Sequence, residues 1–273
     1  MIPMKNAISF LITAMILGLA LPAMAQDNGG IDPEALIARI LGVENKQREA
    51  VSDVVFDAEY VEGDTDKNGE FVEKIRFVKR VYVKYLEDTV LFHEDYLEYY
   101  KDGELQSREE TAKEAASRLE KDRKRKRRNI SYPMHMPFYP EVRDEYKITY
   151  EGVAEESING YVCHHFKVES LKEDADHVNG DFYFEAESFH LVRVDFTPAK
   201  LVKKLMFKLK KLDMSVLYAP RSEGFWFPTQ FDVQGAGKAA LFVGVKFAGS
   251  EYYRNPVINE GIEDEIFEVD YGE

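Results

Sequence analysis

The stretch FVEKIRFVKRVYVKYL, residues 71–86, alternates apolar and polar side chains over most of its length. Successive side chains of a β-strand point to opposite faces, so this run has two different faces. The apolar face holds Ile75, Phe77, Val81, Val83 and Tyr85, and the basic face holds Lys74, Arg76, Arg80 and Lys84. This pattern predicts a long antiparallel strand that is buried on one side and wet on the other.

Shorter runs of the same kind surround this strand along the chain. The predicted strands are 54–60, 89–100, 146–153, 161–170, 181–187, 190–197, 213–219, 225–234 and 239–250. Turn sequences lie between many of them, including Asn159-Gly160, Asn179-Gly180 and Gly235-Ala236-Gly237. The stretch 199–212 mixes apolar residues with pairs of lysines, and the pattern assigns it no type.

Two helices are predicted in the first half of the chain. Asp32-Pro33-Glu34 reads as an N-cap followed by the first helical residues, and the apolar spacing after it predicts an amphipathic helix over 33–50. Ser107 and Glu110 form a capping box that begins a second, polybasic helix near 107–128. The apolar stripe of this helix is narrow and consists of Ala112, Ala115, Ala116 and Leu119. Three prolines between 133 and 140 then predict an irregular crossover.

The first 25 residues have the three parts of a secretory signal. A lysine precedes a short apolar run, and the segment ends in Ala-Met-Ala25. The sequence therefore predicts cleavage after Ala25 and export to a periplasm. We expect residues 26–258 to form a single domain and residues 259–273, which are acidic, to form a C-terminal tail.

The composition excludes several classes of protein. The chain has 273 residues and a net charge of −14, which argues against general nucleic-acid binding. With 45% hydrophobic and 13% aromatic residues it can bury a sizeable core, so global disorder is excluded. Its one cysteine allows no internal disulfide, so packing must supply the stability.

Cys163-His164-His165 places the only cysteine of the sequence next to two histidines, which are residue types that bind metals and act in catalysis. It could be a metal site, a thiol with its base, or part of a strand. We interpret it as part of a strand, with His164 on the apolar face, because no further ligand or orienting group is evident in the sequence. No phosphate loop or hydrolase motif occurs either, so we expect no metal, no cofactor and no catalytic residue. An envelope hydrolase that uses His93, His164 or His165 remains an alternative.

The basic run at the end of the second predicted helix permits three interpretations. It could be a solvated helix end, a contact with anionic lipid, or a nucleic-acid patch, and the acidic charge of the chain disfavours the last. The residues that would touch anionic lipid are Arg123, Lys124, Arg125, Lys126, Arg127 and Arg128.

The second half of the chain resembles the LolA-like proteins, the periplasmic carriers and sorting factors of outer-membrane lipoproteins. Six segments carry the resemblance: 159–169, 180–184, 190–196, the apolar-basic run that ends at Tyr218, 224–228 and the strand that ends near Tyr252-Tyr253. The resemblance implies an α+β fold, mainly antiparallel β, in which an incomplete β-barrel or strongly curved sheet is covered by helices. It also implies an apolar cavity that holds acyl chains.

The implied function is lipid or lipoprotein binding without catalysis. The expected partners are acyl chains of lipids or lipoproteins, and an inner-membrane complex or an outer-membrane acceptor. An alternative on the same fold is an envelope sensor or scaffold that binds a membrane-protein partner. The candidate cavity residues are apolar strand positions: Phe77, Val81, Phe166, Val168, Phe182, Phe184, Val194 and Phe196.

Overall fold

The computed structural model describes residues 30–66, 70–86, 89–124, 137–201, 203–204, 207–221, 224–239 and 243–268. Within these ranges Asp32 onward forms one compact unit, and the predicted signal peptide lies outside them. No helix in the described part of the chain is both long and apolar enough to cross a membrane.

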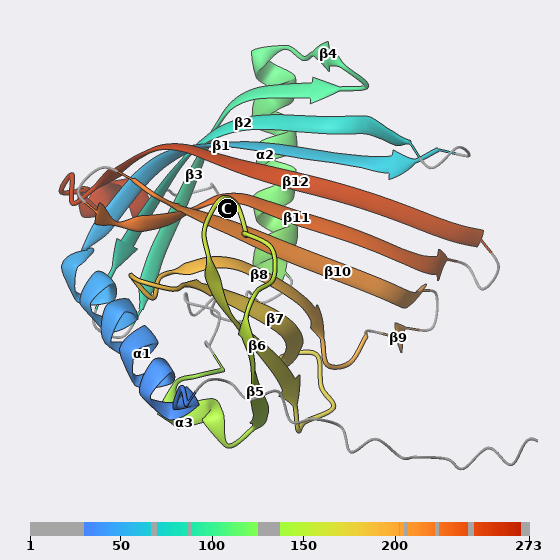
Figure 1. Cartoon of the computed structure of the whole chain (residues 1–273). Coiled ribbons are helices and arrows are strands. Elements are labelled where there is room, and N and C mark those ends of the chain that lie inside the picture. Colours follow the sequence, from blue (N-terminus) through green and yellow to red (C-terminus); the bar gives the residue numbers. More distant parts are fainter. Residues whose placement is uncertain are drawn as a thin grey trace, which may run out of the picture. The chain divides into compact units, whose positions relative to one another are not determined.

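The unit is built around one antiparallel sheet of twelve strands (Figure 1). Its strands, in chain order, are β1 (Asp53–Thr65), β2 (Phe71–Tyr85), β3 (Val90–Lys101), β4 (Glu104–Leu105), β5 (Tyr146–Val153), β6 (Cys163–Ser170), β7 (Val178–Glu185), β8 (Leu191–Pro198), β9 (Lys203–Lys204), β10 (Phe207–Pro220), β11 (Trp226–Ala239) and β12 (Val243–Ile258). In space the order is β4-β3-β2-β1-β12-β11-β10-β8-β7-β6-β5, with β9 beside β10. The sheet is open, since among the described residues β4 and β5 do not pair with each other. The predicted fold class is confirmed.

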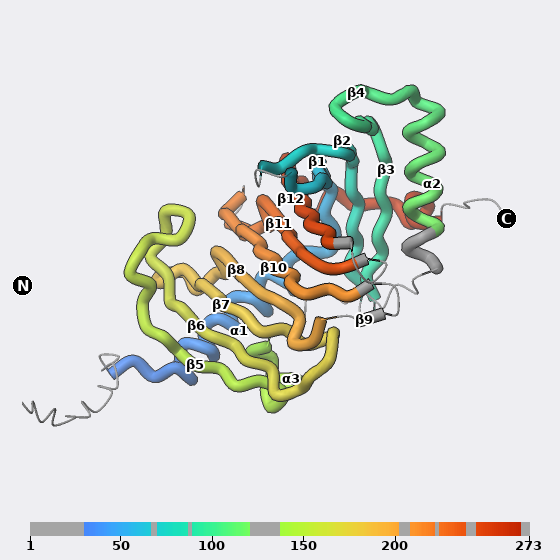
Figure 2. The backbone as a smooth tube through the Cα atoms, turned by 90° about the vertical axis from the view of Figure 1, so that its right-hand side faces the viewer, coloured from blue at the N-terminus to red at the C-terminus, as the bar shows by residue number. Residues whose placement is uncertain are grey.

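The helices cover opposite ends of this sheet. Helix α1 (Pro33–Ala50) has the predicted bounds, and the Asp32 carboxylate accepts a hydrogen bond from the Glu34 amide at 3.0 Å. Helix α2 (Arg108–Lys124) begins with the predicted capping box, in which the Glu110 amide donates to Ser107 Oγ at 3.2 Å. Figure 2 shows α1 behind β6–β8 and α2 beside β3 at the other end of the strand order. A short helix, α3 (Pro140–Arg143), leads into β5.

The region around Gly235 differs from the sequence prediction. Residues 235–237 were predicted to form a turn, but β11 continues through them and pairs with β12 as far as Ala239. The reason lies in packing across the strands. A Cβ atom at Gly235 would lie 2.2 Å from Cζ of Phe247, so the glycine makes room for that ring. The stretch of unassigned type contains β9 and the first part of β10, which pair with each other.

The start of the acidic C-terminal stretch packs against the sheet. Lys84 Nζ donates to the Ile262 carbonyl at 2.8 Å and lies 2.6 Å from a carboxylate oxygen of Asp264. Ile262 is buried, and a short 3₁₀ helix, η2 (Asp264–Phe267), follows it. These contacts hold residues 262–264 beside the end of β2.

Candidate functional site

The eight predicted cavity residues lie on one face of the sheet. Directly opposed residues of antiparallel strands point to the same side. Phe166 opposes Phe182, and Phe182 opposes Val194. The same row of partners continues through Val216, Phe231, Glu251 and Tyr60 to Phe77. We call this side of the sheet the apolar face.

Six of the eight pack together beneath α1. They form one core cluster with Leu36, Ile37 and Ile40 of the helix and with Phe138. Their exposed fractions lie between 0% and 8%, so protein atoms cover them almost completely. The six residues are Phe166, Val168, Phe182, Phe184, Val194 and Phe196. Whether they also line a ligand cavity stays a prediction.

The other two residues lie at the opposite end of the apolar face. Val81 belongs to a cluster with Val54, Phe56 and Val83, and Phe77 stacks on Tyr99 with ring centres 4.8 Å apart. The guanidinium of Arg118 from α2 lies 4.5 Å above the Phe77 ring. The structure therefore does not bring these two residues into contact with the six beneath α1.

Phe138 is the residue that the sequence reasoning missed in the α1 cluster. Its side chain is fully buried, and its ring meets those of Phe166, Phe182 and Phe184 edge-on at 5.3 to 5.5 Å. It comes from the proline-rich segment before α3, not from a helix or strand. A segment of the chain thus inserts one aromatic side chain into the cluster beneath α1.

The middle of the apolar face is less completely covered. Met214, Phe231, Val233 and Phe247 are only half-buried, and they lie between the residues beneath α1 and those near α2. The apolar face therefore has closely packed ends and a partly exposed centre.

A charged group also lies on the apolar face. Lys79 follows Phe77 by two residues, and its Nζ lies 2.8 Å from Glu94 Oε1 and 2.6 Å from Glu251 Oε1. Burial alone would lower the pKa of Lys79, but the two carboxylates outweigh it and hold that pKa above its usual value. The sequence indicates this placement, because Lys79 lies two residues from both Phe77 and Val81 and therefore on the same face of the strand.

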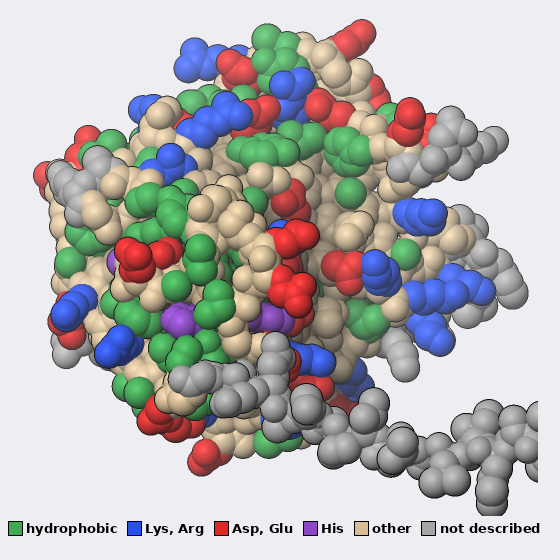
Figure 3. Space-filling view, in the orientation of Figure 1, with side chains coloured by type: hydrophobic (Ala, Val, Ile, Leu, Met, Phe, Trp, Pro, Cys, Tyr) green, Lys and Arg blue, Asp and Glu red, His purple; other side chains and the backbone are tan. Residues whose placement is uncertain are grey.

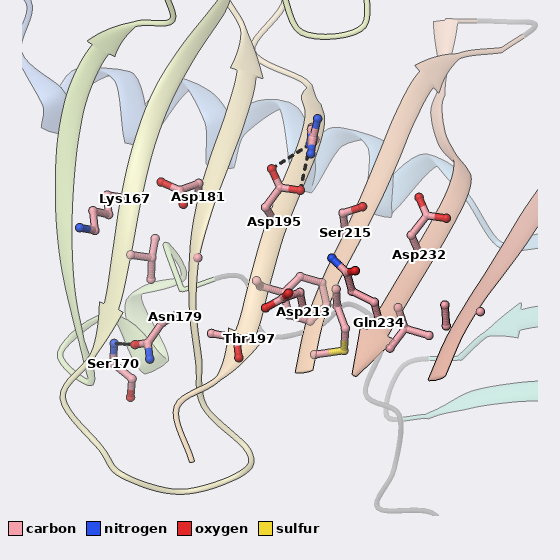
Figure 4. A pocket seen from close by; sticks show the side chains of 18 of the residues that line it. Lys167, Ser170, Asn179, Asp181, Asp195, Thr197, Asp213, Ser215, Asp232 and Gln234 are labelled. Atoms are coloured by element: carbon pink, nitrogen blue, oxygen red, sulfur yellow. Dashed lines mark hydrogen bonds and ion pairs between the residues drawn. The ribbon is translucent and has the colours of Figure 1, made fainter. Parts of the chain in front are cut away.

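The opposite face of the sheet is polar and carries a hollow of about 830 Å³. Figure 4 shows Asp181, Asp195, Ser215 and Asp232 on neighbouring strands, with α1 on the far side of the sheet. Figure 3 shows acidic side chains gathered where the surface is hollowed near the centre of that view. Two of the eight predicted cavity residues, Val168 and Phe196, also contribute to the lining of this hollow.

The polar groups of the hollow bind one another. Arg193 Nε donates to Asp195 at 2.9 Å, and Ser250 Oγ donates to Asp232 at 2.6 Å. His165 Nε2 lies 2.8 Å from Asp181. No group of three or more metal-ligating side chains with suitable geometry occurs in the described part of the chain.

Cys163 and His164 are parts of a strand, as predicted. The thiol is fully buried, and burial raises its pKa to about 11, so it is protonated at neutral pH. His164 opposes Phe184 on the apolar face, and its Nδ1 lies 2.9 Å from the Tyr150 hydroxyl oxygen. A protonated thiol is a poor nucleophile, so Cys163 does not suit covalent catalysis.

Two histidines of this region predict a dependence of stability on pH. Burial lowers the pKa of His164 and that of His190, which stacks on Trp226 at 5.2 Å. The unfolded chain therefore takes up these protons first as pH falls below about 6.5, and the free energy of unfolding decreases. His177 acts in the opposite sense, because its hydrogen bond to Glu145 raises its pKa and its contribution is lost as pH rises.

We expect His164→Gln/His190→Phe to flatten the decrease in stability between pH 7.5 and 5.5. Urea unfolding at each pH measures it, and His93→Gln serves as the control on a histidine away from this region. An equally steep decrease in the double variant would contradict the prediction.

Of the predicted anionic-lipid contacts, only Arg123 and Lys124 fall within the described residues, where they belong to the last turn of α2. Arg125, Lys126, Arg127 and Arg128 lie outside the described residues.

Comparison with known proteins gives likenesses of fold. No family model matches the chain, and no curated protein matches it in sequence. A solved DUF1329 family protein from Desulfovibrio piger aligns with 87% of this chain and 98% of its own, at 14% identity and a TM-score of 0.44. An outer membrane lipoprotein-sorting protein domain from Vibrio parahaemolyticus aligns with 85% of this chain and 97% of its own, at 10% identity and a TM-score of 0.43.

A LolA superfamily protein from Nitrosomonas europaea aligns with 85% of this chain and 98% of its own, at 10% identity and a TM-score of 0.36. At these identities each match is a likeness of fold alone.

Proposed function

We propose that this chain is an exported, non-enzymatic protein that binds the acyl chains of lipids or lipoproteins on its apolar face. It would carry or sort outer-membrane lipoproteins in the periplasm, between an inner-membrane complex and an outer-membrane acceptor. The observation that supports the proposal is the apolar face itself, which runs across the sheet and is only half-buried at Met214, Phe231, Val233 and Phe247.

The energetics of such binding require only apolar contact. Each methylene group removed from water contributes about 0.8 kcal/mol, so a long acyl chain needs a surface and not a catalytic group. The half-buried centre offers such a surface without any movement of the chain. The six residues beneath α1 become accessible only when Phe138 or α1 moves away, because both pack directly on them.

The proposal predicts lipid in the purified protein. We expect the mature chain to retain acyl lipid when it is isolated from its own envelope, and to bind a fluorescent fatty acid saturably. Mass spectrometry of an organic extract and fluorescence titration measure the two results. Phe231→Asp places a charge on the half-buried centre and should weaken probe binding at least about tenfold, whereas Gln230→Asp on the polar face should not.

An extract without lipid together with no saturable binding would overturn the proposal. Equal binding by Phe231→Asp and wild type would remove the apolar face as the site.

A second candidate function is the binding of a protein partner, as a sensor or scaffold would do. The observation in its favour is the polar hollow, which is large and carries hydrogen-bonding side chains from six strands. Crosslinking in cells separates the two functions, because a carrier should trap many lipoproteins and a sensor one fixed membrane protein. Contact of residues 123–128 with anionic lipid stays a prediction under either function.

A further inference from the structure

The two edges of the sheet are protected differently. At one edge α2 packs beside β3, and β4 pairs with the last residues of β3. At the other edge β5 is the outermost strand (Figure 2), and within the described ranges no strand pairs with its outer side. An eight-residue edge without such cover can accept another strand.

The outer side of β5 presents backbone groups in a regular pattern. The Leu171 amide donates to the Glu145 carbonyl at 2.8 Å, so the backbone groups of Glu145 point toward β6. In an antiparallel pair this direction alternates along the strand. Ile148 and Tyr150 therefore point their N–H and C=O groups outward, away from β6.

The side chains of β5 favour one particular partner strand. Lys147 and Glu151 are both exposed and lie symmetrically about Thr149. If β5 pairs antiparallel with β5 of a second copy, centred on Thr149, Lys147 of each copy opposes Glu151 of the other. The outward backbone groups of Ile148 then oppose those of Tyr150, so the same register satisfies the hydrogen bonds.

We propose that β5 is a docking edge for a second copy of this chain, giving a two-fold symmetric dimer with one continuous sheet. A two-fold contact repeats each interaction, so two Lys147–Glu151 pairs form at once. A lysine on an edge strand ordinarily opposes strand addition, but here the partner strand supplies its carboxylate. Glu151 is the extra residue of the bulge between Tyr150 and Gly152, so the regular pairing ends there and spans Lys147 to Glu151. This inference does not rest on acyl-chain binding.

Charge reversal tests the register directly. The wild-type mature chain should show a concentration-dependent monomer–dimer equilibrium in sedimentation velocity. Lys147→Glu alone and Glu151→Lys alone should each raise the dimer dissociation constant about tenfold or more, because two attractive pairs become repulsive. The double variant, and an equimolar mixture of the two single variants, should both dimerise about as tightly as wild type.

Two controls keep the test specific. Glu169→Gln removes the intramolecular partner of Lys147, which lies 3.0 Å away, and should leave dimerisation unchanged. Lys74→Glu changes a charge on β2, far from this edge, and should do the same. A protein that stays monomeric at all concentrations, or single variants that dimerise like wild type, would overturn the proposal. Failure of the mixture to dimerise would overturn the register.

Discussion

Phe138→Ala is expected to lower the free energy of unfolding by about 3–5 kcal/mol. The side chain is fully buried, and its ring packs edge-on against three phenylalanines of the sheet. Its removal leaves an apolar cavity beneath α1, because the strands around it are held by their own backbone pairing. Urea unfolding followed by circular dichroism measures the loss.

The same substitution should strengthen binding of acyl chains if the proposed function is correct. A fatty acid can fill the space that the ring leaves, so it should raise the urea midpoint of Phe138→Ala more than that of wild type. Phe138→Leu keeps part of the volume and should lie between the two. Phe71→Ala, at a ring that is 48% exposed, is the control and should cost little.

A loss below about 1 kcal/mol for Phe138→Ala would show that the residue does not anchor the segment. An unchanged response to fatty acid, with the expected loss of stability, would leave Phe138 structural and contradict its role at a binding site.

Much of this fold could be predicted from local sequence. Asp32-Pro33 fixed the start of α1, since an N-cap and a first-turn proline act within a few residues. Alternation located β2 and β5 to within one residue, because strand parity is also local. The order of the strands was not predictable in this way. The pairing of β1 with β12 joins segments almost 200 residues apart in the chain.

The candidate site shows the same division. Parity placed Phe166 and Phe182 on one face correctly, but parity says nothing about what covers that face. Phe138 lies in a segment without periodicity, so only tertiary packing identifies it. The turn predicted at residues 235–237 failed for a similar reason, because the glycine there accommodates a ring on the next strand and not a reversal of the chain.

Lys79 is a charged residue at a strand position that alternation assigns to the apolar face. Its substitution gives the second large expected loss of stability. Its ammonium group is flanked by Glu94 and Glu251, and the three side chains are only 9%, 10% and 18% exposed. Tyr96 and Tyr253 donate hydrogen bonds to the outer oxygens of the same carboxylates, at 2.9 Å and 3.1 Å. The cluster is therefore hydrogen-bonded at both carboxylates, as a buried ion cluster must be to be tolerated.

We expect Lys79→Met to lower the free energy of unfolding by about 3–5 kcal/mol, because two buried carboxylates then lack their cation. Lys79→Met/Glu94→Gln/Glu251→Gln removes all three charges and should recover most of the stability. Lys74→Met on the same strand breaks only an exposed pair with Asp102 and should cost less than about 1 kcal/mol. Urea unfolding of wild type, Lys79→Met, the triple variant and Lys74→Met measures these differences. Equal losses of unfolding free energy for Lys79→Met and Lys74→Met would show that the buried cluster contributes no more to stability than an exposed ion pair.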